Sequence, residues 1–165
     1  MHPDMRPWVV PAGLALVFAL ATSVAAVAQD SPMRRLMGRW AGDASVVPIA
    51  GPALPFTCVV TYIAADNGVD MRQNLRCKTT GYKVETTTDF KIDGERVSGR
   101  WEDKINAIDG DVTGTVTANG FDVQLSGRFF AARMQVSSSA CEQTVKITPE
   151  EGDLIRAITA SLKKC

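Results

Sequence analysis

Histidine, the side chain that most often acts as a general base near neutral pH, occurs once among the 165 residues, as His2. Serine–histidine catalysis, cysteine–histidine catalysis and histidine-ligated zinc therefore have no imidazole in the rest of the sequence. Two acidic stretches, 66–70 and 109–111, lack the ligand number and spacing of a calcium loop, and turn formation explains them. We expect no enzyme, no cofactor and no metal site.

Cysteine is the second residue type that could carry chemistry. The chain has four cysteines, which are Cys58, Cys77, Cys141 and Cys165. An even number of cysteines in an exported domain indicates disulfides, for which the count alone allows three connectivities.

Aromatic residues recur in one local pattern, glycine–arginine–aromatic, at 38–40, 99–101 and 127–129. At 99–101 the hairpin register places the glycine and the ring inward and the arginine outward. One interpretation is core packing with solvated arginines, and the other is that the inward rings line a ligand cavity. The candidate residues for either role are Trp40, Tyr62, Trp101 and Phe121.

The start of the chain resembles an export signal. An apolar run over 8–28 ends in the small-residue site Ala26-Val27-Ala28, as secretory signal peptides do. The run is also long enough to span a bilayer, so an uncleaved anchor is the alternative, but the alanine-rich end favours cleavage. We expect a signal peptide over 1–28, a flexible segment over 29–35 and one domain over 36–165. The cleaved protein would have no membrane span and would lie in a periplasm or be secreted.

Asparagine–glycine and aspartate–glycine dipeptides, the preferred centres of two-residue hairpin turns, divide the domain into strands. They lie at 67–68, 93–94, 109–110 and 119–120. The first turn pairs Cys58 with Cys77 on the apolar face of its hairpin, which predicts one disulfide. Strict counting makes this a hydrogen-bonded pair, whose Cβ atoms are further apart than at the alternate sites. The other two cysteines then form the second bridge.

Two more of these turns predict specific registers. The turn at 93–94 pairs Phe90 with Val97, and the turn at 119–120 pairs Val116 with Val123. Both registers place apolar side chains opposite one another on a single face of each hairpin, as in antiparallel sheets with one buried face.

Beyond residue 127 the apolar positions change from odd to even numbers, which indicates a bulge or a barrel corner near Phe129-Phe130. Residues 154–163 fit a strand or a helix, and the surrounding meander favours a strand. A meander with one apolar face buries that face by closing on itself. We therefore expect an all-β fold, a small antiparallel up-and-down barrel of about 8–10 strands, stapled by disulfides.

Gly38-Arg39-Trp40 resembles the Gly-x-Trp signature on the first strand of lipocalins and the wider calycin barrels. This resemblance implies a calycin-like barrel that holds a small hydrophobic ligand.

A longer resemblance extends over most of the domain. The segments 73–77, 81–83, 97–102 and 162–164 resemble a family of small exported proteins of alphaproteobacteria. The resemblance implies a bacterial periplasmic or secreted setting and a final strand, and it carries over no catalytic residue. Cys58 and Cys77 fit the family's pattern, whereas the other two cysteines are additions.

The formal charges balance, with 18 basic and 18 acidic side chains, so no overall basic field exists to attract nucleic acid or anionic lipid. The inward aromatic rings lie beside small inward residues such as Gly99 and Gly114, which could leave a void. The leading hypothesis is an exported, non-enzymatic binding protein for a small apolar or amphipathic molecule. The alternative is a protein-interaction module, such as a protease inhibitor or a structural component of the cell envelope, acting through loops or Gln29–Arg35.

Overall fold

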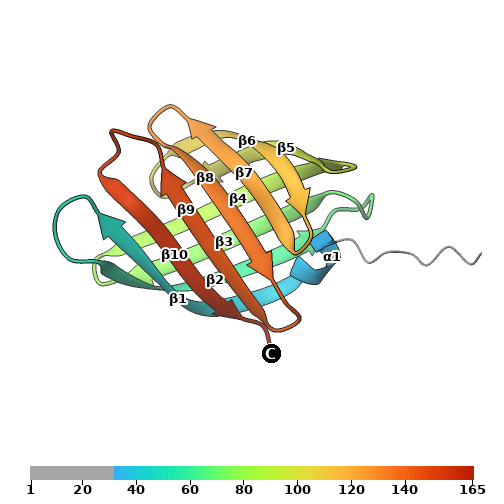
Figure 1. Ribbon diagram of the computed structural model, residues 1–165, viewed down its shortest axis with the longest axis horizontal. Helices are drawn as coiled ribbons and strands as arrows, with labels where there is room; N and C mark the ends of the chain where they lie inside the picture. Colours follow the sequence, from blue (N-terminus) through green and yellow to red (C-terminus); the bar gives the residue numbers. More distant parts are fainter. Residues whose placement is uncertain (1–31) are drawn as a thin grey trace, which may run out of the picture.

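The computed structural model describes residues 32–165, so the predicted signal peptide over 1–28 lies outside the described residues. One short helix, α1 (Pro32–Leu36), precedes ten strands (Figure 1). The strands are β1 (Gly38–Pro48), β2 (Leu54–Ala64), β3 (Met71–Thr79), β4 (Tyr82–Asp93), β5 (Arg96–Asp103), β6 (Ile108–Thr117), β7 (Gly120–Gly127), β8 (Ala131–Ser138), β9 (Glu142–Pro149) and β10 (Ile155–Lys163).

The ten strands form one closed barrel in which each strand pairs with its neighbours in the chain and β1 pairs with β10. All of the pairings are antiparallel, which confirms the predicted disulfide-stapled up-and-down barrel. The strands follow the period-2 pattern of a half-buried sheet, most clearly in β8, where buried and exposed residues alternate from Ala132 to Ser138. Because the barrel is closed, the sheet has no edge strand. Among residues 32–165, no helix combines the length and hydropathy needed to cross a membrane.

Helix α1 closes one end of the barrel, which we call the closed end (Figure 1). The side chains of Met33 and Leu36 are buried in the core, and the indole Nε1 of Trp40 donates a hydrogen bond of 2.7 Å to the carbonyl of Leu36. Pro32 suits the first turn of a helix, where its missing N–H is not needed. Of the segment 29–35 that the sequence predicted to be flexible, the described part, 32–35, therefore belongs to an ordered helix.

The β2–β3 hairpin has the predicted register, with Cys58 opposite Cys77, and the two cysteines form a disulfide. The expected hydrogen-bonded spacing is wrong, because the ladder ends at a hydrogen bond from Ala65 N to Asp70 O rather than one residue closer to the turn. Counting from that bond, the cysteines occupy a non-hydrogen-bonded site, where facing residues are closer. Their Cα atoms are 4.1 Å apart.

The registers predicted from 93–94 and 119–120 are each wrong by two residues. Phe90 lies opposite Gly99 rather than Val97, and Val116 lies opposite Phe121 rather than Val123. A shift of two preserves the inward face, so the predicted core positions survive. The β4–β5 turn begins at Gly94, whose φ of 59° suits the first turn position rather than the second.

The two glycines at 110 and 120 are strand residues and not turn residues, which corrects the prediction for those dipeptides. A Cβ at Gly120 would collide with the carbonyl oxygen of Val136 on β8, so this position allows close strand approach. The parity change near Phe129-Phe130 is the β7–β8 loop and not a bulge. A register shift instead occurs in β1, between Val47 and Pro48.

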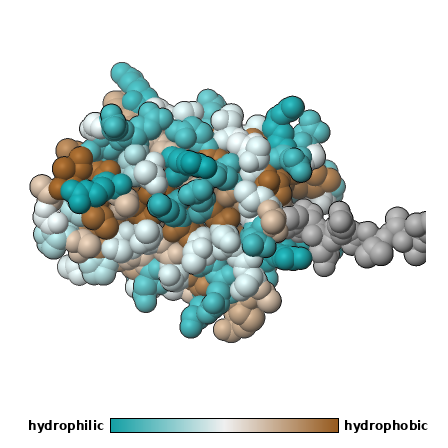
Figure 2. Space-filling model, viewed as in Figure 1, coloured by the Kyte–Doolittle hydropathy of each residue, from teal (hydrophilic) through white to brown (hydrophobic). Residues whose placement is uncertain are grey.

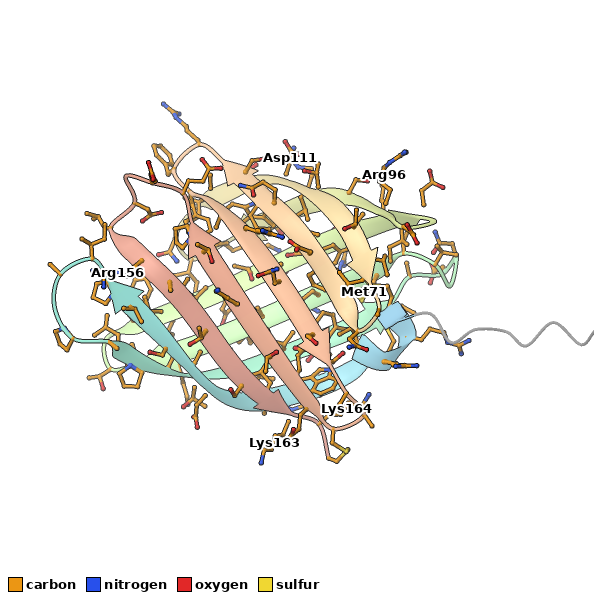
Figure 3. The ribbon with its side chains drawn as sticks, viewed as in Figure 1. Met71, Arg96, Asp111, Arg156, Lys163 and Lys164 are labelled. Carbon is orange, nitrogen blue, oxygen red and sulfur yellow. A yellow bond between two sulfur atoms is a disulfide. The ribbon has the colours of Figure 1, made fainter. Side chains whose placement is uncertain are left out.

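The last strand, β10, confirms the strand interpretation of 154–163. A second disulfide joins Cys141, just before β9, to Cys165 at the closed end. Beside it, Lys164 donates from Nζ to the carbonyl oxygens of Arg35 and Met37 at 3.3 and 2.9 Å. Lys163 and Lys164 lie at this end and Arg156 at the opposite end (Figure 3). The chain's last residues therefore hold α1 in place.

Candidate functional site

The closed end is filled by large side chains that are almost wholly buried. Phe90 and Phe121 pack with their ring centroids 5.1 Å apart, and Trp40 and Tyr62 lie in the same buried cluster. Below them, Leu36 of α1 is fully buried. This half of the barrel is a packed core.

The other end, which we call the mouth, is surrounded by the loops 49–53, 80–81, 104–107, 128–130 and 150–154. Five inward-facing apolar residues near it are only partly buried; they are Val46, Leu75, Val84, Ile147 and Ala160. Inward residues of the same kind on β5 and β7, such as Val97 and Val123, are 1% exposed. Because both groups include valine, the difference in exposure comes from their positions in the barrel and not from the residue type. Inward side chains near the mouth on β1, β3, β4, β9 and β10 are therefore less enclosed than those on β5 and β7.

Small residues keep this side of the interior open. Ala44 on β1 lies directly opposite Ala160 on β10, so two methyl groups face each other where larger side chains would fill the space. Gly42, one inward position further from the mouth, packs so closely on β10 that a Cβ would collide with the carbonyl oxygen of Ser161. Strands β1 and β10 therefore approach each other closely at this position.

A polar group lies within the core at the closed end, on the strand ends next to the loops 65–70 and 139–141. Gln73 Nε2 donates to the Tyr62 hydroxyl at 3.0 Å, and that hydroxyl donates to Gln143 Oε1 at 3.3 Å. Gln143 is 1% exposed, and its Nε2 has no hydrogen-bond partner among the described residues. An unpaired buried amide donor costs on the order of 1–3 kcal/mol, so it is a place where an acceptor atom would be stabilising.

Burial raises the pKa of the Tyr62 phenol far above its usual value, and the hydrogen bonds from Gln73 and Gln143 only partly oppose this. Tyr62 is therefore neutral at any physiological pH. As a neutral phenol, it orients the two amides by hydrogen bonding and does not exchange protons with a substrate.

Trp101 lies nearer the mouth, and glycines make room for its ring. A Cβ at Gly110 would lie 2.8 Å from the indole Nε1, and a Cβ at Gly127 would lie 3.0 Å from its Cζ2. The ring meets Phe130 edge-on, with centroids 6.1 Å apart. The buried indole Nε1 has no partner among the described residues, so it is a second unpaired donor. The glycine–arginine–aromatic pattern at 99–101 thus marks a ring that covers neighbouring strands.

All four aromatic residues proposed from the sequence are buried in one core cluster. The structure brings Tyr62 together with two glutamines and Phe121 with Phe90, and it places Trp40 against α1. Sequence reasoning missed Gln73 and Gln143 as members of the site. Their inward position on otherwise apolar strand faces was the available signal, since the predicted register already placed Gln73 opposite Tyr62.

Sequence reasoning also missed a set of exposed apolar side chains around the mouth, which we call the apolar rim. Every loop at the mouth carries or adjoins at least one of them, and hydrophobic surface is visible at this end as well as along the middle of the barrel (Figure 2). The apolar rim consists of Ile49, Leu54, Tyr82, Ile105, Phe129 and Leu154.

No protein-family model and no curated protein matches the sequence. Among solved structures, the chain is similar to Rv2717c from M. tuberculosis, with a TM-score of 0.65 and 12% identity over 79% of this chain and 93% of that chain. It is also similar to the S-type phycobiliprotein lyase CPES from Guillardia theta, with a TM-score of 0.53 and 14% identity over 82% of this chain and 92% of that one. At these identities the likeness shows the barrel fold.

Proposed function

We propose that this protein is an exported, non-enzymatic binding protein that takes a small apolar or amphipathic ligand into the barrel through the mouth. The observation that carries the proposal is the partial exposure of inward apolar residues such as Leu75 and Val84, in a barrel whose opposite end is filled by buried rings. Apolar surface that remains wet inside a concave wall is stabilised when an apolar molecule covers it, by about 25 cal/mol per Å².

The polar group inside the barrel supports an amphipathic ligand with a hydrogen-bond acceptor. Gln143 Nε2 and Trp101 Nε1 are buried donors that no described acceptor satisfies. A ligand oxygen that reached either donor would remove the desolvation penalty of that group. In this proposal Trp101 contributes to the lining, while Trp40, Tyr62 and Phe121 form the packed floor beneath it.

The disulfides support the exported setting. Cys58–Cys77 and Cys141–Cys165 are both closed, and such bridges persist in oxidising compartments. Together with the signal-like segment over 1–28, they favour a periplasmic or secreted location. The likeness to CPES shows that the same fold occurs in a protein named as a phycobiliprotein lyase.

The sequence also raised a protein-interaction module that acts through Gln29–Arg35. The described part of that segment forms α1, whose Met33 is buried in the core. This use of the segment favours the ligand-binding proposal, because residues that close a barrel end are not free to enter a partner.

The test is to fill the open half of the interior. Ala44→Phe places a ring between β1 and β10 inside the barrel, and Ala41→Phe is the matched control on the outer face of the same strand. Binding of the apolar fluorophore anilinonaphthalene sulfonate, and its displacement by a fatty acid, is measured for each protein. Native mass spectrometry of protein purified from its own compartment identifies any ligand that is retained.

We expect Ala44→Phe to weaken fluorophore binding by at least about tenfold, which corresponds to about 1.4 kcal/mol, while Ala41→Phe leaves it unchanged. Circular dichroism checks that both variants fold. Wild-type protein that binds no apolar probe, or an Ala44→Phe variant that is folded and binds as tightly as wild type, would refute the proposal.

A further inference from the structure

Three neighbouring hairpins carry, in or next to their mouth loops, the same two-residue combination of an exposed apolar side chain and a cation. The pairs are Tyr82-Lys83, Lys104-Ile105 and Arg128-Phe129. Their apolar members are 50%, 49% and 72% exposed in the same order, and all three cations are exposed.

The three pairs form one continuous arc. The loops that carry them join β3 to β4, β5 to β6 and β7 to β8, which follow one another around the barrel. The Tyr82 hydroxyl donates to Asn106 Oδ1 at 3.3 Å, which links the first loop to the second. Trp101 and Phe130 are in ring contact, which links the second hairpin to the third loop. The arc is therefore a single surface with a fixed arrangement.

Most of the positive charge on this arc is free to meet an anion. No ion pair involving Lys83 or Arg128 is formed among the described residues, and Lys104 pairs with Glu102 at 3.2 Å on an exposed surface. The Arg128 guanidinium lies 5.0 Å from the Phe129 ring centroid, so a cation lies directly beside this exposed aromatic ring. Basic side chains continue from the arc along a hollow of about 700 Å³ over β2–β4, which Leu75 and Val84 also line. This hollow is lined by Arg39, Arg76, Lys78, Lys83 and Lys104, with Glu85 as its one acidic side chain.

The carboxylates of β5 and β6 that lie within the arc are engaged by neighbouring groups: Glu102 pairs with Lys104, Asp103 accepts hydrogen bonds from Ile105 and Asn106, and Asp109 pairs with Arg100. Glu150, Glu151 and Asp153 belong to the β9–β10 loop, outside the arc, and two of them are engaged within the fold. Glu150 accepts a hydrogen bond from Gln124, and Asp153 accepts one from the backbone of Ile155. The balanced charge of the chain predicted no basic field, but among the described residues the carboxylates of the arc are paired while Lys83 and Arg128 form no ion pair.

We propose that this arc docks the protein on an anionic lipid bilayer, with the mouth facing the membrane. Apolar side chains on separate loops enter the boundary between headgroups and acyl chains, and the adjacent cations remain at the level of the lipid phosphates. A bilayer fits better than a flat protein partner, because each apolar group has its own cation beside it. An apolar ligand could then pass between bilayer and barrel without crossing water. Docking does not depend on ligand binding, since it uses the rim and not the interior.

The experiment is co-sedimentation of the full domain with phosphatidylcholine vesicles, with and without phosphatidylglycerol. One variant combines Ile105→Ser with Phe129→Ser, and a second combines Lys83→Gln, Lys104→Gln and Arg128→Gln. The matched apolar control combines Ile63→Ser with Val69→Ser, which are 50% and 55% exposed near the closed end. The matched charge control is Lys91→Gln with Arg96→Gln, also near that end.

We expect wild type to bind vesicles that contain phosphatidylglycerol, and both closed-end controls to bind as wild type does. The serine variant should lose binding, and each neutralised cation should weaken it by about fivefold at low salt. The proposal would be overturned if rim and closed-end variants lost binding equally, or if binding did not depend on phosphatidylglycerol. It would also be overturned if sedimentation velocity showed self-association in place of vesicle binding. The Ala44→Phe variant should lose fluorophore binding and keep vesicle binding, so failure of one proposal is distinguishable from failure of the other.

Discussion

The two ends of this barrel are built from the same ten strands but differ in how fully their inward side chains are buried. At the closed end, α1 and large side chains such as Trp40 and Phe90 leave the core almost fully buried. At the mouth, inward side chains such as Leu75 retain contact with solvent, and apolar side chains project from the loops. A strand's inward face therefore says little about burial until the position along the barrel is known.

The difference shows how stability and binding are divided. Close packing at one end supplies the transfer and dispersion energy that holds the barrel shut. The stability from this end offsets the cost of leaving apolar surface uncovered at the other end. That uncovered surface is unfavourable for folding but favours binding of an apolar ligand. The disulfide Cys58–Cys77 lies inside, toward the open half, and Cys141–Cys165 lies at the closed end.

The largest expected effect comes from the same substitution made in both halves. Leu36→Ala removes a fully buried side chain at the closed end and should lower the free energy of unfolding by about 2–5 kcal/mol. Leu75→Ala removes a side chain that is already partly solvated, so it should cost about 1 kcal/mol. Urea unfolding followed by tryptophan fluorescence measures both. Equal losses would mean that the two halves are packed alike.

Removal of each disulfide should separate stability from binding. Replacing Cys58 and Cys77 by alanine opens a loop of sequence separation 19 and should destabilise the domain by about 3 kcal/mol. Because Cys77 faces the open interior, this variant should also bind the apolar fluorophore more weakly. The matched variant of Cys141 and Cys165 should lose similar stability and keep its binding. The comparison would be contradicted if the second variant lost binding instead.

Lys164→Met should loosen the closed end alone. This substitution removes the hydrogen bonds from Nζ to the carbonyls of Arg35 and Met37, along with the cation 5.0 Å from the Trp40 ring centroid. The expected loss is about 1 kcal/mol, with faster amide exchange at Met37. Unchanged exchange at Met37 would show that the chain's last residues do not hold α1.

The smallest expected effect lies on the outer wall and serves as a control that belongs to neither end. The Arg133 guanidinium, hydrogen-bonded to Asp122, lowers the pKa of that carboxyl. The stabilisation is complete above the unfolded pKa of about 4 and is lost as the pH falls through the lower folded value. Asp122→Asn should therefore cost about 0.5 kcal/mol at neutral pH and less at about pH 3, by urea unfolding at both. An equal loss at both pH values would rule out the ion pair as its cause.

Much of the fold could be predicted because strand alternation and turn residues are local signals. They placed Cys58 opposite Cys77 and Trp101 inward, and both follow from short stretches of chain. Turn positions were less certain, because a glycine serves close strand approach as well as turns. Gly120 meets the backbone of β8, and Gly110 lies beneath Trp101, so neither is a turn residue.

The candidate site was harder to predict, because it depends on which end of the closed barrel is filled. Leu75 and Val123 look alike in the sequence, since each is an inward apolar strand residue, yet only Leu75 meets solvent. The element that closes the filled end is the five-residue helix α1 (Pro32–Leu36), which is too short to give a periodic pattern in the sequence. The cation-bearing arc likewise becomes visible only when three separate loops meet at one end.

The most direct test of the central claim is methyl NMR of the domain titrated with a spin-labelled fatty acid. The account predicts that paramagnetic broadening is confined to inward methyl groups of the open half, including those of Val46, Leu75 and Val84. The methyl signals of Val97 and Val123 should stay sharp, because those side chains are enclosed in the packed half. Broadening spread evenly over both halves, or restricted to outward residues such as Val59, would contradict a ligand site that opens at the mouth.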